Sequence, residues 1–240
     1  MANHKVRLKK KEDVAEGTMA FHFEKPSGFQ FKPGQFANLT LLDPPETDAE
    51  GNVRTFSIAS APFEADLMFA TRMRDTAFKR VLKAMPLGTE ITLGGPFGSF
   101  ILHSDSSRPG VFLAGGIGIT PFRSMVLHAS KSRFPHRLLL FYSNRRPEDA
   151  AFLKELKAIE KENPRYSIIG SMTQIEKSKQ KWEGRTGFID KEMLSGSLDD
   201  LKGSIYYVAG PPKMVSAIGH TLADFGVSED NIRSEDFAGY

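Results

Sequence analysis

The stretch from Val111 to Pro121 constrains the fold of this chain more than any other. Val111 to Leu113 form a short apolar run without charge, which is typical of a buried parallel strand. A glycine-rich turn follows, and apolar residues then recur at helical spacing. A strand, a glycine turn and a helix N-terminus suit a phosphate, because the backbone can approach the anion and free N–H groups point at it. Proline replaces the third glycine of the dinucleotide fingerprint, so the turn alone leaves a purely structural role open.

After Pro109, strands and helices alternate. Strands are expected near 111–113, 138–142, 166–170 and 205–208. Helices are expected near 121–131, near 148–161 and in a last segment that ends at Gly226. This alternation predicts a Rossmann-like parallel sheet with helices on both faces. Ligands of such sheets bind beyond the carboxyl ends of the strands, and those ends are 114–121, 143–147 and 209–214.

Before about residue 105 the chain has a different character, with short apolar or alternating segments separated by Gly and Pro. Strands are predicted at 19–23, 35–41, 55–60, 67–73 and 90–93. Several short strands with turn signals between them predict a small antiparallel β-barrel. One helix, over 76–85, interrupts the series, and 43–52 is predicted as a surface loop. We therefore expect a barrel domain over 1–105 and an α/β domain over 106–240.

The composition excludes several classes of function. The chain has 240 residues and a net charge of +3, too small to indicate nucleic acid as a partner. It has no cysteine, which rules out a thiol nucleophile and a cysteine-ligated iron–sulfur cluster within this sequence. Its six histidines are scattered, so we expect no metal site. We expect no membrane span, since no apolar run is long enough, and a cytoplasmic protein, since the N-terminus lacks a signal-peptide core.

The barrel half holds a second constellation, Arg54-Thr55-Phe56-Ser57. An aromatic residue and a hydroxyl on one strand, with arginine beside them, suit a planar heteroaromatic ligand that carries a phosphate. Arg72 and the predicted helix start at Thr76 add a possible second anion site. The strand could also simply alternate its residues between core and water.

The motifs of the two halves together resemble those of the ferredoxin–NADP reductase superfamily, in the same order and over nearly the whole chain. Arg54-Thr55-Phe56-Ser57 resembles its Arg-x-Tyr-Ser flavin motif, and 115–121 is similar to its nicotinamide-nucleotide pyrophosphate loop. Three further segments resemble the entry to the flavin strand, the end of the barrel and the loop beside the nicotinamide, at 31–36, 95–100 and 210–214. The resemblance implies a flavin-binding barrel followed by a nucleotide-binding α/β domain.

On the flavin side, the resemblance implies a role for individual residues. Arg54 would bind the flavin phosphates, Phe56 would pack against the isoalloxazine, and Ser57 would act as a catalytic orienting residue near flavin N5. Thr76 takes the place of a phosphate-binding hydroxyl, whereas Met73 stands where the family has glycine. The full set of expected flavin contacts is Arg54, Thr55, Phe56, Ser57, Arg72, Met73 and Thr76.

On the nucleotide side, the resemblance implies contacts from Gly115, Gly116, Gly118, Thr120, Pro121, Gly210, Pro211 and Met214. Ser143, Asn144 and Arg145 follow the second strand of the sheet, where the family reads the adenosine 2′ position. Arginine favours a 2′-phosphate, so we predict NADPH, with NADH possible. The alternative is that Arg145 and Arg146 only face solvent.

The tail from Arg233 to Tyr240 resembles the family's C-terminus, in which an acidic residue precedes an aromatic ring that covers the flavin. Phe237 fits this spacing best and is expected at the flavin face, as a second catalytic residue beside Ser57. Tyr240 is the alternative stacking ring, or a ring over the adenine. A frayed terminus is the structural alternative.

The resemblance therefore implies an FAD-dependent NAD(P)H oxidoreductase. NADPH would pass a hydride to FAD, and single electrons would then go to a separate acceptor, either ferredoxin, flavodoxin or a haem protein, or to a small molecule. FAD is preferred over FMN because single-chain members of this size generally use it. Two alternatives stay open: a flavin-holding electron-transfer subunit of a larger complex, and a flavin-free nucleotide-binding module.

Overall fold

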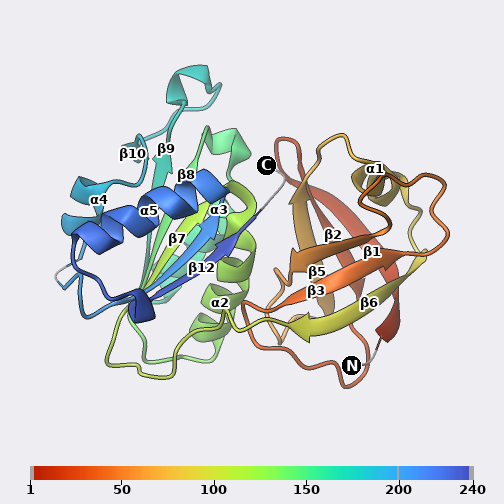
Figure 1. The fold of residues 1–240 in the computed structure, drawn as a ribbon, viewed down its shortest axis with the longest axis horizontal. Coiled ribbons are helices and arrows are strands. Elements are labelled where there is room, and N and C mark those ends of the chain that lie inside the picture. The colour runs from red at the N-terminus through yellow and green to blue at the C-terminus, as the bar shows by residue number, and fades with distance from the viewer. Residues whose placement is uncertain (1–2, 199, 238–240) are drawn as a thin grey trace.

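The structure is a computed structural model that describes residues 3–198 and 200–237. Within these residues the chain forms two six-stranded sheets, one antiparallel and one parallel, which lie side by side (Figure 1). The change of character near residue 105 falls in the connection between them, since the last barrel strand ends at Phe97 and the parallel sheet begins at Gly110. No helix in the described ranges is long and apolar enough to cross a membrane.

The antiparallel sheet has the order β4-β3-β6-β1-β2-β5. Its strands are β1 (Asn3–Ala15), β2 (Thr18–Glu24), β3 (Phe36–Leu41), β4 (Val53–Ser57), β5 (Asp66–Arg72) and β6 (Glu90–Phe97). The segment after β4 closes the sheet into a barrel, because the N–H of Ala59 donates to the carbonyl of Met68 in β5 at 2.8 Å. The predicted antiparallel barrel is confirmed.

Strand β1 is not among the predicted strands. Its buried residues Val6 and Leu8 alternate with exposed Lys5, Arg7 and Lys9, so one face packs on the core and the other faces water. Because most residues of β1 are charged, the alternation of buried and exposed side chains is not visible as an alternation of apolar and polar residues.

Helix α1 (Ala77–Ala84) lies over one end of the barrel, as the spacing of its apolar residues predicts (Figure 1). Phe78 and Leu82 are buried on its inner face. Thr76 caps its N-terminus, since the hydroxyl oxygen accepts from the N–H of Lys79 at 3.4 Å. One of the free N–H groups at the start of α1 is therefore paired with a side chain of the same segment.

The parallel sheet has the order β10-β9-β8-β7-β11-β12. Its strands are β7 (Gly110–Gly115), β8 (Leu138–Asn144), β9 (Tyr166–Met172), β10 (Arg185–Thr186), β11 (Ile205–Gly210) and β12 (Ile232–Asp236). Helices α2 (Ile119–Lys131) and α3 (Leu153–Glu162) pack on one face, and α4 (Lys191–Ser195) and α5 (Pro212–Asp224) on the other. The chain leaves β7 toward β8 and later returns on its other side as β11, so the strand order reverses at β7. The predicted parallel sheet covered on both faces is confirmed.

Some boundaries differ from the prediction. The helix expected near 148–161 is instead a 3₁₀ turn at Pro147–Asp149 followed by α3, which begins only at Leu153. Phe152, between the 3₁₀ turn and α3, has a left-handed backbone with φ 61°, so the two do not join into one helix. Its side chain packs between the two sheets. The predicted strand 55–60 is β4, which ends at Ser57. Strands β10 and β12 and helix α4 are not among the predicted elements.

Arg123 of α2 joins the two halves. All five of its N–H donors are used: three bond Glu64 and the carbonyl of Ala59 in the barrel half, and two bond Glu155 of α3, at 2.7 to 3.1 Å. Its side chain is only 4% exposed. The neighbouring Ser124 donates to the carbonyl of Ser60 at 2.7 Å. The relative position of barrel and sheet thus rests on a buried, fully paired guanidinium.

Replacing Arg123 with Ala is expected to lower the free energy of unfolding by about 3–5 kcal/mol, because two carboxylates and a carbonyl then lose their donor. Urea denaturation of the purified protein measures this. Lys131→Ala, an exposed residue at the end of the same helix, is the control and should change little. A loss below about 1 kcal/mol for Arg123→Ala would show that the guanidinium does not hold the halves together.

Candidate functional site

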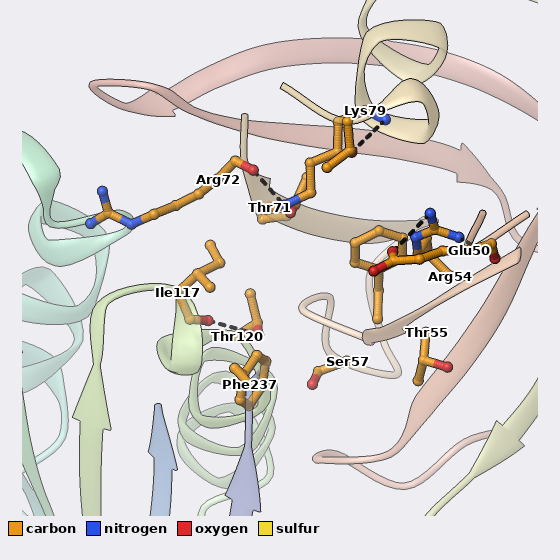
Figure 2. A pocket seen from close by; sticks show the side chains of 13 residues that line it. Glu50, Arg54, Thr55, Ser57, Thr71, Arg72, Lys79, Ile117, Thr120 and Phe237 are labelled. Carbon is orange, nitrogen blue, oxygen red and sulfur yellow. Dashed lines mark hydrogen bonds and ion pairs between the residues drawn. The ribbon is translucent and has the colours of Figure 1, made fainter. Parts of the chain in front are cut away.

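A crevice of about 310 Å³ lies between the barrel and the parallel sheet (Figure 2). One wall comes from β4, β5 and α1, and the other from the turn after β7 and from Phe237 at the end of β12. The predicted residues Arg54, Thr55, Phe56, Ser57, Arg72, Thr76, Thr120 and Phe237 all line it. The fold therefore brings together residues from both ends of the chain.

On the β4 wall, the phenyl ring of Phe78 in α1 supports two of the predicted ligand-facing residues. The ring of Phe56 lies 6.0 Å from it, and the Arg54 guanidinium lies over its face at 5.3 Å. Ser57, which is 7% exposed, follows on the same strand and opens into the crevice. Thr55 is turned to the neighbouring strand, where its hydroxyl donates to the Asn38 side chain at 2.7 Å.

Arg54 is not a free cation. Its Nη2 donates to the carboxylates of Asp48 and Glu50 at 2.9 and 3.0 Å, and its Nη1 donates to the carbonyls of Glu50, Gly51 and Val53. Figure 2 shows Arg54 and Glu50 side by side at one end of the crevice. The guanidinium that the motif assigns to a phosphate is thus committed to its own loop.

Two other cations line the crevice. Figure 2 shows Arg72 extending away from Arg54, toward the α/β half, and its guanidinium has no bonded partner in the described part of the chain. Lys79, which the sequence reasoning missed, lies one helical turn after Thr76 and so shares its side of α1. Burial, together with the nearby charges of Arg74 and Arg54, lowers the pKa of Lys79. The uncompensated positive charge would suit an anion.

Two residues of the expected flavin set have other contacts. The side chain of Met73 packs against the barrel core, and its N–H donates to the carbonyl of Gly17 at 2.8 Å. This anchor holds the chain after β5 against the β1–β2 turn. Thr76 lines the crevice, but its hydroxyl is the α1 cap described above.

Two glycines at the end of β7 and in the turn after it lie against the segment 209–214, Gly115 against a side chain and Gly118 against backbone. A Cβ on Gly115 would lie 2.2 Å from Met214 Sδ, and a Cβ on Gly118 would lie 2.2 Å from the carbonyl oxygen of Ala209. Ile117 and Thr120 reach the crevice from this turn. The segments 115–121 and 209–214 are therefore pressed together at the end of the sheet, as their predicted places imply.

The helix start at this turn is open to an anion. Gly116 has a positive φ of 53° and leads through a short 3₁₀ turn into α2, whose first turn contains Pro121 and no acidic residue. Thr120 donates to the carbonyl of Ile117 at 3.0 Å and keeps the turn closed. The backbone N–H groups at this helix start carry the partial positive charge of the helix dipole.

The predicted tail residue Phe237 is fixed at the same place. Its N–H donates to the carbonyl of Gly210 at 3.0 Å, and its ring packs against apolar residues that include Ile117 and Ala70. Figure 2 shows the ring beside Thr120 and facing the Ser57 wall. The alternative ring, Tyr240, lies outside the described residues.

A second cavity of about 400 Å³ adjoins the first and shares Ser57 and Phe237 with it. Glu235 lines it, and burial raises the pKa of this carboxyl to about 7. Sequence reasoning places an acidic residue before the aromatic ring but gives it no role. The period of two along β12 could have shown that Glu235 and Phe237 share one side of the strand.

At the end of β8 the predicted residues divide into buried and exposed. Ser143 and Asn144 are buried, and both polar atoms of the Asn144 side chain lack a hydrogen-bond partner in the structure as described. Arg145 is exposed, and its side chain has no bonded partner within 3–198 and 200–237. Arg146 bonds Asp149 in a capping box and also pairs with Glu16. Only Arg145 of the two is available to a ligand.

Comparison with known proteins identifies part of this architecture directly. Residues 112–220 match the family described as the oxidoreductase NAD-binding domain. The chain is 31% identical over 156 residues to a subunit of the Na(+)-translocating NADH-quinone reductase of Methylococcus capsulatus, a match that covers 63% of this chain and 38% of that protein. It is 27% identical over 224 residues to the glycine betaine monooxygenase reductase subunit of Chromohalobacter salexigens, covering 92% and 60%. The chain thus spans less than two thirds of these relatives.

A ferredoxin NADP+ reductase from Neisseria gonorrhoeae, solved with bound FAD and NADP, superimposes with a TM-score of 0.82 at 21% identity over 98% of each chain. Both structures consist of two modules, an antiparallel barrel followed by a parallel sheet with helices on both faces. The chain therefore shares the fold of this reductase, and most of its α/β half matches the oxidoreductase NAD-binding family.

Glu235 gives the protein a pH-dependent stability. Because its pKa in the fold, about 7, lies above the ordinary value of 4.5, the protonated form is favoured by folding, and this contribution is lost as the pH rises through 7. At about pH 8.5, Glu235→Gln is expected to raise the free energy of unfolding by about 1–2 kcal/mol, allowing for partial exposure.

At about pH 3.5, below the ordinary value of 4.5, the same variant should equal the wild type, because the carboxyl is then protonated in both the folded and the unfolded chain. Urea denaturation at both pH values measures the difference, and Asp236→Asn, the exposed neighbour, is the control. An equal gain at both pH values would contradict the assignment.

Proposed function

We propose that this protein is an FAD-dependent NAD(P)H oxidoreductase that takes electrons from NADPH and passes them to a separate acceptor. The observation that carries the proposal is the crevice in which Ser57 of the barrel faces Phe237 of the sheet, next to the glycine turn after β7. A flavin bound there would accept a hydride from the nicotinamide and release electrons one at a time.

The fit to a flavin rests on residues of β4, β5 and α1 and on Phe237. Phe56, held on Phe78, would offer a ring face to the isoalloxazine, while Ser57 would donate a hydrogen bond to its edge. Arg72, Lys79 and, after a change of partner, Arg54 would balance the phosphates. Phe237 would cover the opposite face and yield to the nicotinamide.

The nucleotide would lie along the carboxyl end of the parallel sheet. The N–H groups of the turn from Gly116 to Thr120 would hold its pyrophosphate, at a helix start whose first turn has no acidic residue. Pro211 begins the turn into α5 and, with Gly210, fixes the neighbouring loop. These contacts would orient the nucleotide and exclude water from the space between the rings.

The preference for NADPH rests on Arg145. The N–H of Gln174 donates to the carbonyl of Arg145 at 2.8 Å, so the segment after β9 lies beside it and brings exposed Lys177 to the same edge. The two cations Arg145 and Lys177 favour a 2′-phosphate over a free hydroxyl, and there is no carboxylate among Ser143, Asn144 and Arg145.

The acceptor would be a separate protein. One relative is named as the reductase subunit of a monooxygenase, and another as a subunit of an NADH-quinone reductase. Both names describe one component of a larger enzyme system, which supports a partner protein here. An acidic electron carrier, such as a ferredoxin or flavodoxin, or a haem protein or oxygenase component, is the class we propose, with a small molecule as the alternative.

The absorbance spectrum of the protein, taken anaerobically before and after NADPH is added, tests this function. We expect a flavin spectrum that bleaches on addition. A protein that takes up FAD but is not bleached by NADPH or NADH would instead favour a flavin-holding subunit. A colourless protein that does not take up FAD would favour a flavin-free nucleotide-binding module.

Ser57→Ala is expected to slow flavin reduction by NADPH about 10- to 100-fold while leaving FAD affinity within about threefold, because the hydroxyl orients rather than anchors the ring. Stopped-flow absorbance gives the rate, and fluorescence titration gives the affinity. Ser57→Thr keeps the hydroxyl and should recover part of the rate. An unchanged rate in Ser57→Ala would remove the proposed role.

Arg145→Ala is expected to lower kcat/KM for NADPH about 10- to 100-fold and to leave that for NADH nearly unchanged, because only the 2′-phosphate loses a charged partner. Steady-state assays with each nucleotide measure the ratio. Arg146→Ala is the matched variant, and since Arg146 is bonded to Asp149 it should keep the ratio. A wild type that prefers NADH would overturn the choice of nucleotide.

A further inference from the structure

The loop 43–52, between β3 and β4, puts a carboxylate at the position expected for a flavin phosphate. Asp48 Oδ1 accepts from Arg54 Nη2 at 2.9 Å, and Asp48 Oδ2 accepts from the N–H of Ala77, the first residue of α1, at 3.2 Å. A guanidinium and a helix N-terminus are both anion-binding groups, and one carboxylate spans them. The anion position is therefore filled by the chain itself.

The rest of the loop holds this carboxylate in place. Glu46 pairs with Arg80 of α1 at 2.5 Å, which ties the loop to the helix. At the base of the loop, the Asn52 side chain donates to the carbonyl of Leu41 at 2.8 Å. The N–H of Glu50 donates to Asp48 Oδ1 at 3.1 Å, so the loop backbone also positions the carboxylate.

Asp48 is the more shielded of the two carboxylates on Arg54. The Asp48 side chain is 32% exposed, whereas that of Glu50 is 74% exposed. Burial opposes ionisation of Asp48, but hydrogen bonds from Arg54 and from the Glu50 and Ala77 N–H groups hold its pKa below the ordinary value. At neutral pH it is thus a charged ligand of Arg54, better screened from water than Glu50.

We infer that Asp48 acts as an internal stand-in for the flavin phosphate and must be displaced when the cofactor binds. This inference rests on the proposed function. A phosphate and the Asp48 carboxylate cannot share Arg54 and the Ala77 N–H, because two anions a few ångströms apart repel each other. Asp48 therefore weakens the affinity for phosphorylated flavins and makes the bound flavin exchangeable. It has no effect on the contribution that the ring system makes to binding.

Asp48→Asn tests this by removing the charge and keeping the shape. Flavin-free protein is titrated with FAD, FMN and riboflavin, and binding is followed by flavin fluorescence. We expect the variant to bind FAD and FMN about tenfold more tightly than the wild type, because Arg54 loses the more shielded of its two carboxylate partners and the competing charge is gone. Riboflavin, which has no phosphate, should bind both proteins equally. Asp43→Asn, an exposed residue of the same loop, removes the same charge and should change none of the three affinities.

Hydrogen exchange of the wild type provides a second measurement that needs no variant. FAD should raise exchange at the Glu50 N–H, whose acceptor Asp48 is displaced, while riboflavin should not. Unchanged or weaker FAD binding in Asp48→Asn, or an equal gain for riboflavin, overturns the inference and leaves the proposed function standing. If neither protein binds any flavin, both fall. If Asp48→Asn does not fold, the exchange measurement decides.

Discussion

The buried Arg123 is the interaction on which the arrangement of the two halves depends. Although burial favours its neutral form, hydrogen bonds to Glu64 and Glu155 raise its pKa, so the guanidinium stays charged and its five donors stay paired. The barrel groups that it bonds, Ala59 and Glu64, follow Ser57 closely along the chain. Ser57 ends β4, and the segment just after it is bonded through Arg123 to the α/β half. The position of the proposed orienting hydroxyl relative to the parallel sheet is therefore fixed.

The contacts of Arg123 also explain the irregular backbone at Phe152. Phe152 adopts a left-handed backbone, unusual for a bulky residue, and its ring lies 5.2 Å from the Arg123 guanidinium. Continuing the 3₁₀ turn at 147–149 into one helix would withdraw this ring from the space between the halves. Packing between the modules thus overrides the helical pattern of the sequence at 148–152, which is why the predicted helix starts late.

The repeating patterns of the sequence were sufficient for the architecture. Alternation gave the barrel, strand–helix succession gave the sheet, and glycine spacing located the turn after β7. Two kinds of element were not predicted. In β1 the charged face obscures the alternation, and β10, with two residues, is too short to show a pattern. The seven-residue motif at 115–121 placed its residues at the sheet end, but no local pattern shows that Arg54 is bonded to Asp48 or that Arg123 bridges Glu64 and Glu155. Those pairings are set by tertiary structure, because each partner lies on a different element.

The two proposed phosphate positions use different physics. At the turn after β7 the donors are backbone N–H groups, whose partial charges do not titrate. The first turn of α2 has no acidic residue that would neutralise them. At α1 the donors are mainly side chains, together with the Ala77 N–H, and the loop 43–52 supplies carboxylates that compete for them. A site of the first kind is ready for its ligand at all times. A site of the second kind must exchange one ion pair for another, so its affinity depends on the difference between two similar interactions rather than on either alone. Salt screens both pairs alike, and affinity at α1 should therefore depend less on ionic strength than the number of cations there suggests.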